Sequence, residues 1–547
     1  MTHGQRRNDL NRNTALLEPD HLVGHYLVGV SEAALSVKVA DQEAHGRRSR
    51  RGWVISFGLF FALLGGWSFA TPMMAAPDEP AHVIRAAAVA SGQFYGSPES
   101  NAPYGVSPYV AVEVPAVFAH TYFVASCFRA RPSTPATCAS PVGGSAQLVK
   151  VNTYVGRYPP LYYLLVGWPM ALFPSATGIH LARLVSALLS SFFLAGALEA
   201  AFRNRRSRLL VVGVMLAATP QMLFLGGVIN PSGLEISSAI CLWTSLLVLS
   251  GHEATRAPSR SLIALAGLSA TVLAATRPLS DVWLFLIVAT AFAIVGRKRV
   301  IMLFRNRHVK AWITLVLASA AWSLWWVIDH DSFAIAPSTL KPPTDTSLGH
   351  IAVLLLANTG QQLRQMVGVV GWLDTPAPLI TIALWAAVLC LVVGLAVAMG
   401  RRRDLVVLVV LMAASVLVPV ALRLPEAHSL GLVGQGKDTM PLVVGVPIVA
   451  AWAIRERRVS PAASRVRQLH LLALAGLATA QIVMFLGALR RYEVGITGPV
   501  NFLDGLWRPP LPLGVLVAGF MVATGLFAWW ISVHSKGAAQ LGKPIFR

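Results

Sequence analysis

Long apolar segments with almost no charged residues recur along this chain, and they restrict its fold more than any other feature. Many of them run 16 to 23 residues, and about 17 to 25 apolar residues cross a bilayer as a helix. Only 13% of the residues are charged, whereas a soluble globular protein carries about 25%. The alternation of polarity over about ten residues that barrel strands require is missing. The sequence therefore predicts an all-α integral membrane protein.

The apolar pattern predicts about 12 transmembrane helices. The expected spans are 53–72, 179–201, 209–228, 233–250, 261–276, 279–296, 311–328, 377–399, 404–422, 439–454, 468–488 and 513–533. Residues 160–173 are also apolar, but a stretch of 14 residues is short for a span. We expect it to lie on the outer membrane surface. Counting it as a span would reverse the orientation of everything that follows.

The basic residues set the expected orientation. The formal net charge is +21, and 31 of the 45 Lys and Arg residues fall in loops and tails on one side of the predicted spans. Such an asymmetry marks the cytoplasmic side, so we expect a multi-pass protein of the plasma membrane with both termini in the cytoplasm. The same distribution argues against a nucleic-acid partner, because the charges are spread between apolar segments.

The predicted topology divides the chain into a membrane domain and two tails. Residues 1–51 should form a disordered cytoplasmic tail and residues 534–547 a C-terminal cytoplasmic tail, on either side of a multi-pass domain at 52–533. A signal peptide is the rival interpretation of the first apolar segment, but that segment is long enough to span. The largest extracytoplasmic loops are then 73–178 and 329–376.

The first extracytoplasmic loop contains two of the four cysteines, Cys127 and Cys138. An oxidising compartment permits a disulfide between them, and the alternative is a pair of free thiols. The even pair and its compartment favour the disulfide.

The strongest polar cluster opens the same loop, at Pro77-Asp78-Glu79-Pro80-Ala81-His82-Val83-Ile84-Arg85. If a helix begins at Pro80, Asp78, His82 and Arg85 fall on neighbouring turns of one face. An acid, an imidazole and a guanidinium would then meet at the end of the first span. The alternative is that Asp78 or Glu79 only caps the helix, as acids do ahead of a proline in the first turn.

A second group of motifs follows further along the chain. Arg157-Tyr158-Pro159-Pro160-Leu161-Tyr162-Tyr163 precedes Arg183-Leu184-Val185-Ser186-Ala187, and Asn230-Pro231, Arg277-Pro278, Gly371-Trp372-Leu373-Asp374-Thr375 and Gln435-Gly436-Lys437 come later. On physical grounds alone, the prolines and tyrosines are typical of an anchor at the membrane interface.

Taken together, these motifs resemble the bacterial family of predicted membrane proteins called domain of unknown function 2142. The acidic pair after the first span and the tyrosine-rich motif also resemble polyprenyl-phosphate-sugar-dependent glycosyltransferases of the GT-C fold. The match runs from about Trp53 to the last span. The chain departs from the family at Lys437-Asp438, where the family pattern has Arg followed by an aromatic residue.

The resemblance implies a transferase that moves a sugar from a polyprenyl-phosphate donor to an envelope glycan or lipid acceptor at the extracytoplasmic face. It assigns the general base to Asp78, with Glu79 as its substitute. The residues expected to bind substrate are His82, Arg85, Tyr158, Arg183, Asn230, Arg277, Gln435 and Lys437. No cofactor is certain, and a divalent metal stays an option. Membrane lipids are the remaining expected partners.

The sequence raises three alternatives to a glycosyltransferase. A transporter or flippase of a lipid-linked glycan should place ionisable residues near the bilayer midplane, which the sequence does not do. A non-catalytic assembly partner stays open. The stretch Gly431 to Lys437 fits half of a P-loop, but Asp438 stands where the metal-binding hydroxyl should be and no strand precedes it.

Overall fold

The computed structural model describes residues 50–98, 109–204, 208–251, 259–333, 341–432, 434–454 and 462–540. Residues 1–49 of the predicted N-terminal tail and 541–547 of the predicted C-terminal tail lie outside these residues, whereas 534–540 continue the last helix. Trp53–Arg547 form a unit of their own, separate from Met1–Gly52. The helices and the site described below all belong to that larger unit, apart from the first turn of the first helix.

The described residues confirm the predicted all-α, multi-pass membrane fold. Eight of the described helices are long and apolar enough to cross a membrane, and a bent pair adds a ninth candidate. The long helices are Arg50–Ala70, α6 (Ala176–Phe202), α9 (Pro231–Gly251), α13 (Arg307–Asp329), α16 (Leu379–Met399), α17 (Arg402–Arg423), α21 (Ala462–Val494) and α22 (Leu513–Gln540).

Shorter helices occupy the other predicted spans. These are the bent pair α7 (Leu209–Ala217) and α8 (Pro220–Gly226), then α10 (Arg260–Ala274), α11 (Ser280–Ile294), α19 (Met440–Val443) and α20 (Gly445–Ala453). Every predicted span thus corresponds to a helix or to a broken pair.

A proline explains the bend in the predicted span 209–228. Helices α7 and α8 meet at 59°, because Pro220 has no N–H to donate and disfavours helical backbone in the residue before it. Thr219 is extended instead, and its Oγ1 accepts the Met222 amide at 3.1 Å. The predicted continuous helix is therefore two helices joined by a capped break.

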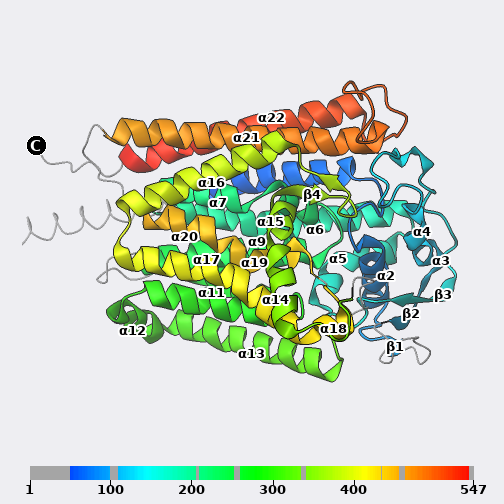
Figure 1. The fold of residues 1–547 in the computed structure, drawn as a ribbon, viewed down its shortest axis with the longest axis horizontal. Helices are drawn as coiled ribbons and strands as arrows, with labels where there is room; N and C mark the ends of the chain where they lie inside the picture. Colours follow the sequence, from blue (N-terminus) through cyan, green and yellow to red (C-terminus); the bar gives the residue numbers. More distant parts are fainter. Residues whose placement is uncertain are drawn as a thin grey trace, which may run out of the picture. The chain divides into compact units, whose positions relative to one another are not determined.

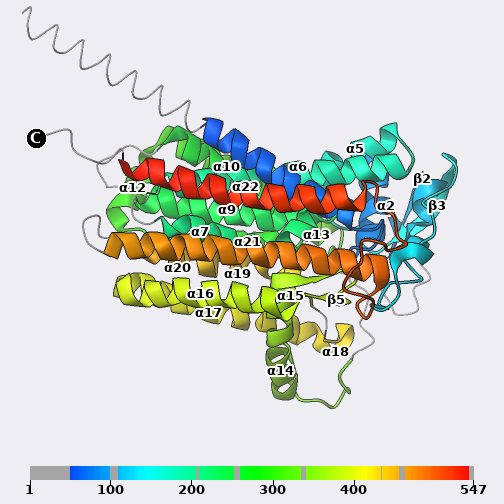
Figure 2. The ribbon, with the colours of Figure 1, turned by 90° about the horizontal axis from the view of Figure 1, so that it is seen from above.

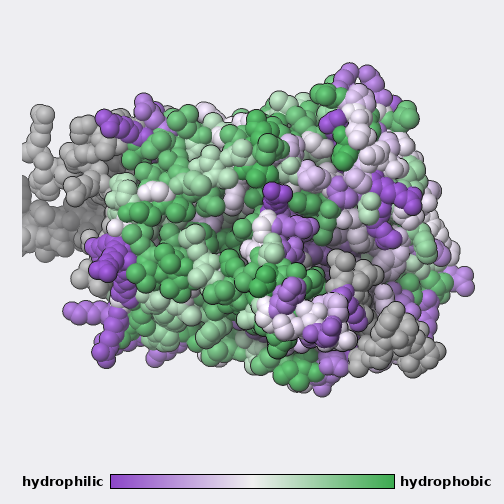
Figure 3. Space-filling view, viewed as in Figure 1, coloured by the Kyte–Doolittle hydropathy of each residue, from purple (hydrophilic) through white to green (hydrophobic). Residues whose placement is uncertain are grey.

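The spanning helices run side by side, as Figure 1 shows. Helix α9 lies inside the bundle and packs on α6 and α10, and 94% of its apolar stretch is buried. Hydrophobic residues cover the middle of the face in Figure 3, and hydrophilic ones gather at the two ends of the bundle. This distribution suits a membrane-spanning bundle.

The described residues of 73–98 and 109–175 build a small mixed layer at one end of the bundle, which we call the sheet end (Figure 1). It contains α2 (Glu79–Ala90), β1 (Ser97–Pro98), β2 (Val110–Pro115), α3 (Ala116–Ala119), α4 (Thr121–Val124), η1 (Ala136–Cys138), β3 (Leu148–Thr153) and α5 (Leu161–Leu172). The strands pair antiparallel in the order β1-β2-β3, and Glu113 lies opposite Lys150. At about 18 Å, the twelve residues of α5 are too short to cross a bilayer.

Cys127 and Cys138 are joined by a disulfide in the structure. The segment that the disulfide closes is held by α21. Arg491 of α21 is fully buried and donates to the carbonyl oxygens of Phe128 (2.8 Å) and Thr134 (2.7 Å) and to the Asp374 carboxylate (3.0 Å).

A second connection crosses the bundle near the sheet end. Helices α14 (Leu348–Ala357) and α15 (Thr359–Gly368) run across the spanning helices (Figure 1), and α14 projects away from α16 and α17 (Figure 2). The remaining elements are α12 (Arg297–Arg305), β4 (Val369–Val370), β5 (Thr375–Pro376), η2 (Leu424–Glu426), α18 (Ala427–Leu430) and η3 (Gly436–Asp438).

Candidate functional site

Asp78 lies at the start of α2 in a conformation that turns its carboxylate away from the helix. Its backbone is left-handed, with φ 64°, and its side chain makes no capping hydrogen bond. The Asn230 amide fixes the approach by donating to the carbonyl oxygen of Pro77 at 3.1 Å. The carboxylate instead accepts a hydrogen bond from the Tyr154 hydroxyl (2.8 Å) and forms an ion pair with Lys437. The capping alternative therefore does not describe Asp78.

Glu79 occupies a different environment, although it is the next residue. It is fully buried and forms a two-point ion pair with Arg183, at 2.7 and 2.6 Å. Its carboxylate also accepts the amides of Met74 (3.1 Å) and Ile229 (3.2 Å). Arg183 in turn donates to the carbonyl oxygens of Ser68, Thr71 and Pro72. This pair ties the start of α2 to α6 and to the end of the first helix.

His82 and Arg85 follow on the same face of α2. The Nδ1 atom of His82 lies 2.9 Å from the Tyr163 hydroxyl. Arg85 is fully buried and donates to the carbonyl oxygens of Phe94 (2.7 Å) and Tyr158 (3.0 Å). Its Nε and Nη1 atoms have no hydrogen-bond partner, and no acid pairs with it among the described residues. Arg85 thus contributes uncompensated positive charge close to His82.

The opposite side of the site comes from η3, from the ends of α9 and α17, and from the connection between α10 and α11. Arg277 pairs with Glu235 (3.0 Å) and with Asp438 (3.1 Å), and Asp438 also faces Arg423 at 3.6 Å. Asp438 accepts the Gln435 amide at 3.0 Å. Since Lys437 directly precedes Asp438, a continuous set of charged groups runs from Asp78 to Glu235.

The electrostatics of the site favour a deprotonated Asp78 and a neutral His82. Burial raises the pKa of Asp78, but the Lys437 charge and the hydrogen bonds from Lys437 and Tyr154 outweigh burial and lower it to about 2. Burial lowers the pKa of His82 to about 3, helped by Lys437 and Arg277 and opposed by Asp78. Burial also lowers the pKa of Arg85 to about 10, which leaves it charged at neutral pH.

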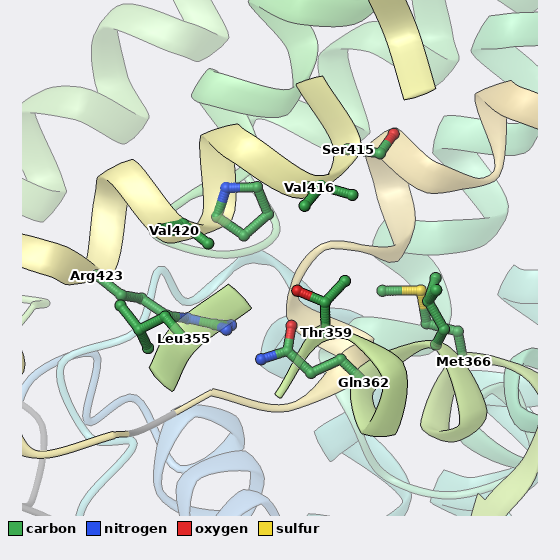
Figure 4. A pocket seen from close by; sticks show the side chains of 10 residues that line it. Leu355, Thr359, Gln362, Met366, Ser415, Val416, Val420 and Arg423 are labelled. Atoms are coloured by element: carbon green, nitrogen blue, oxygen red, sulfur yellow. The ribbon is translucent and has the colours of Figure 1, made fainter. Parts of the chain in front are cut away.

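A small pocket adjoins this set of charges. It lies between α17 and the α14–α15 pair, with Val416, Val420, Leu355 and Met366 among its apolar walls and Arg423 at one side (Figure 4). An apolar surface therefore continues from the Arg423 guanidinium along the bundle.

The structure brings most of the candidate residues together. One region is surrounded by Asp78, His82, Lys437, Arg277 and Tyr158. Lys437 pairs with Asp78, the charges of Lys437 and Arg277 both lower the pKa of His82, and Arg277 also lies close enough to Tyr158 to affect its pKa. Glu79, Arg183 and Asn230 lie beside it as a buried frame. Among the described residues, no group of three or more His, Cys, Asp or Glu side chains is placed to hold a metal ion.

Sequence reasoning missed Tyr154 and Glu235. Glu235 carried a readable signal, because an acid inside an apolar span needs a buried partner or a function. Tyr154 carried none, since one tyrosine among many in a loop is not distinctive. The sequence marks Asp438 as a departure from the family pattern and from a P-loop but assigns it no role, yet it joins Arg277 to Arg423.

Comparison with known proteins gives one family match and one structural likeness. A crystal structure of ArnT from Cupriavidus metallidurans bound to undecaprenyl phosphate aligns with 15% identity and a TM-score of 0.38, covering 89% of this chain and 76% of that one. No curated protein matches the sequence. The model of the family described as "Predicted membrane protein (DUF2142)" matches residues 60–446, which is more than half of the chain. The chain therefore belongs to the DUF2142 family of membrane proteins.

Proposed function

We propose that this protein is a glycosyltransferase that uses a polyprenyl-phosphate sugar at the sheet end, with Asp78 as the general base. The observation that carries the proposal is the environment of Asp78. Its side chain is 23% exposed, whereas the neighbouring acid, Glu79, is fully buried and has four donors. Asp78 is therefore the acid of this pair that an acceptor hydroxyl could reach.

The positive groups around Asp78 suit a phosphate. The charges of Asp78, Glu235 and Asp438 are balanced by those of Lys437, Arg277 and Arg423, and Arg85 adds a buried charge without an acidic partner. A region with net positive charge and little water attracts an anion strongly.

The proposed reaction needs one base and no proton donor. Asp78 takes the proton of an acceptor hydroxyl as its oxygen bonds to the anomeric carbon of the sugar. The bond from that carbon to the phosphate oxygen breaks, and the polyprenyl phosphate leaves with the electron pair. Arg277 and Lys437 stabilise the charge that builds up on the phosphate.

The positions of ionisable residues favour an enzyme over an ion-coupled transporter. In the described spanning helices, Asp, Glu, Lys, Arg and His occur near the helix ends, as Glu235 does in α9, and none occurs in the central third. Transporters place such groups near the midplane. The basic loops opposite the sheet end support an extracytoplasmic position for that end, because basic loops favour the cytoplasmic side.

The test is transfer from a synthetic polyprenyl-phosphate sugar by the purified protein in liposomes. Asp78→Asn should lower transfer by about 10²–10⁴-fold, the usual contribution of a general base, while donor binding is retained. Asp504→Asn, at an exposed acid between α21 and α22, is the matched control. Full transfer by Asp78→Asn would contradict the role of Asp78. Movement of the lipid-linked sugar across the liposome by wild type, without transfer, would support the flippase instead.

A further inference from the structure

The Asp78 carboxylate, which the proposed function needs as a base, is engaged in an ion pair with Lys437. One carboxylate oxygen accepts the Tyr154 hydroxyl at 2.8 Å, and the other is held by the Lys437 ammonium. Each oxygen therefore already accepts one hydrogen bond, and the ammonium on one of them opposes protonation of the carboxylate. The low pKa that Lys437 imposes on Asp78 also makes the carboxylate a weak proton acceptor. In this state Asp78 is unsuited to its task.

The backbone position of Lys437 is fixed by contacts of its two neighbours in the chain, so it does not depend on the ion pair of the ammonium. The η3 turn is anchored by the Gly436 amide, which donates to Gln365 at 2.7 Å, and by Asp438, which Arg277 holds at 3.1 Å. The ammonium stands at the end of a four-carbon chain, and such a group can change partner by rotation alone. Asp78 is the acid with which it pairs in the described structure.

Because Lys437 is next to Asp438 in the chain, its ammonium has a second possible partner nearby, a bound phosphate. Asp438 pairs with Arg277 and Arg423, so a phosphate that binds beside these guanidinium groups would also lie close to Lys437. A phosphate offers more acceptor oxygens than the single carboxylate oxygen that Lys437 now holds.

We infer that Lys437 is an exchangeable counter-ion, which neutralises Asp78 in the empty site and moves to the donor phosphate when the lipid binds, so that Asp78 becomes free to act as base. The inference rests on the proposed function. It makes Lys437 a positioning residue that imposes an order of events, in which phosphate binding precedes deprotonation of the acceptor. When the polyprenyl phosphate departs, Lys437 returns to Asp78.

A zero-length cross-link can follow this exchange without measuring transfer. A carbodiimide activates the Asp78 carboxyl, and the Lys437 amine displaces the urea to form an amide, with the net loss of one water. Tryptic peptides joined through Asp78 and Lys437 should be found in the purified full-length protein. Lys437→Met should abolish this product, whereas Lys341→Met, at an exposed lysine, should not.

The probe is farnesyl phosphate, with farnesol as the uncharged control. At about a hundred times its dissociation constant, farnesyl phosphate should reduce the cross-link to about 1% of its starting yield, because about that fraction of sites stays empty. Farnesol should leave the yield unchanged. Glu113 and Lys150 face each other across β2 and β3, and their cross-link is the internal control for reagent consumed by the phosphate.

Two outcomes would overturn the inference, and they can be told apart. If farnesyl phosphate binds, as titration calorimetry would show, but the Asp78–Lys437 cross-link persists, the exchange is wrong and the proposed function survives. If farnesyl phosphate does not bind to wild type at all, the exchange and the proposed lipid-phosphate chemistry fail together. A loss of the cross-link with the Glu113–Lys150 product unchanged would support the exchange.

Discussion

Replacing Glu79 with Gln should destabilise the protein strongly, although the same type of change at Asp78 should not. The Glu79 carboxylate is fully buried and serves as the counter-ion of Arg183, which is itself fully buried. The Gln amide would remove that negative charge and turn an N–H donor toward the donors of Arg183, Met74 or Ile229. Arg183 would keep its carbonyl partners but lose its counter-ion.

The magnitude follows from the cost of a buried unpaired charge. Breaking a buried ion pair by removing one partner costs about 3–5 kcal/mol, and leaving an amide such as that of Met74 without an acceptor costs about 1–3 kcal/mol. We therefore expect Glu79→Gln to lower the free energy of unfolding by about 3–5 kcal/mol. Because the pair is shielded from solvent, the loss should be nearly the same at low and high salt.

The assay is denaturant titration in mixed micelles, followed by tryptophan fluorescence, with Glu113→Gln at an exposed acid of β2 as the control. Glu113→Gln should change the free energy of unfolding by less than about 0.5 kcal/mol. If Glu79→Gln unfolds at the same denaturant concentration as this control, the structural role of the pair is refuted. If it is stable but has lost transfer, Glu79 takes part in the chemistry instead.

Three further predictions follow from the same geometry. Acid should destabilise the protein in two steps. Because the buried His82 stays neutral in the folded protein, stability falls as the pH drops below the ordinary histidine pKa of 6.5 toward 3, and the roughly 2 kcal/mol that Asp78 contributes above about pH 4 is lost toward pH 2. When thermal unfolding is measured against pH, His82→Gln should lack the first step, and an unchanged profile would contradict this. Replacing Cys127 and Cys138 with Ser should cost about 2–3 kcal/mol for an 11-residue separation, and two freely alkylated thiols in native wild type would show that no disulfide forms. Single cysteines at Arg203 and Lys341 should react with impermeant thiol reagents from opposite sides of the membrane; labelling of both from outside would overturn the orientation.

The sequence predicts the spanning helices well because the bilayer leaves little choice of structure. An apolar segment in lipid must satisfy its backbone internally, so it becomes a helix. The limits appear inside the bundle. Helices α19 and α20 are almost completely buried and break at Val444, and hydropathy alone does not tell a short buried helix from a span. At the α7–α8 bend, Pro220 marked the break, but its angle depends on packing.

The sequence predicts only part of the site. The cluster from Asp78 to Arg85 could be found because it is local and lies at the end of an apolar segment. The difference between Asp78 and Glu79 could not, because it depends on Arg183 from α6. The partner of Asp78 could not be found either, since Lys437 is 359 residues away and one sequence contains no signal for so distant a pairing.

That long separation affects how the protein is made. At about 5–20 residues per second, a ribosome needs roughly 20–70 s to travel from Asp78 to Lys437. During this interval the acid has been synthesised but its counter-ion has not. The segment closed by the disulfide waits about as long for Arg491 in α21, which follows Thr134 and Phe128 by 357 and 363 residues. A nascent chain that stalls before these residues would therefore contain an unfinished site, and insertion of the late helices completes it.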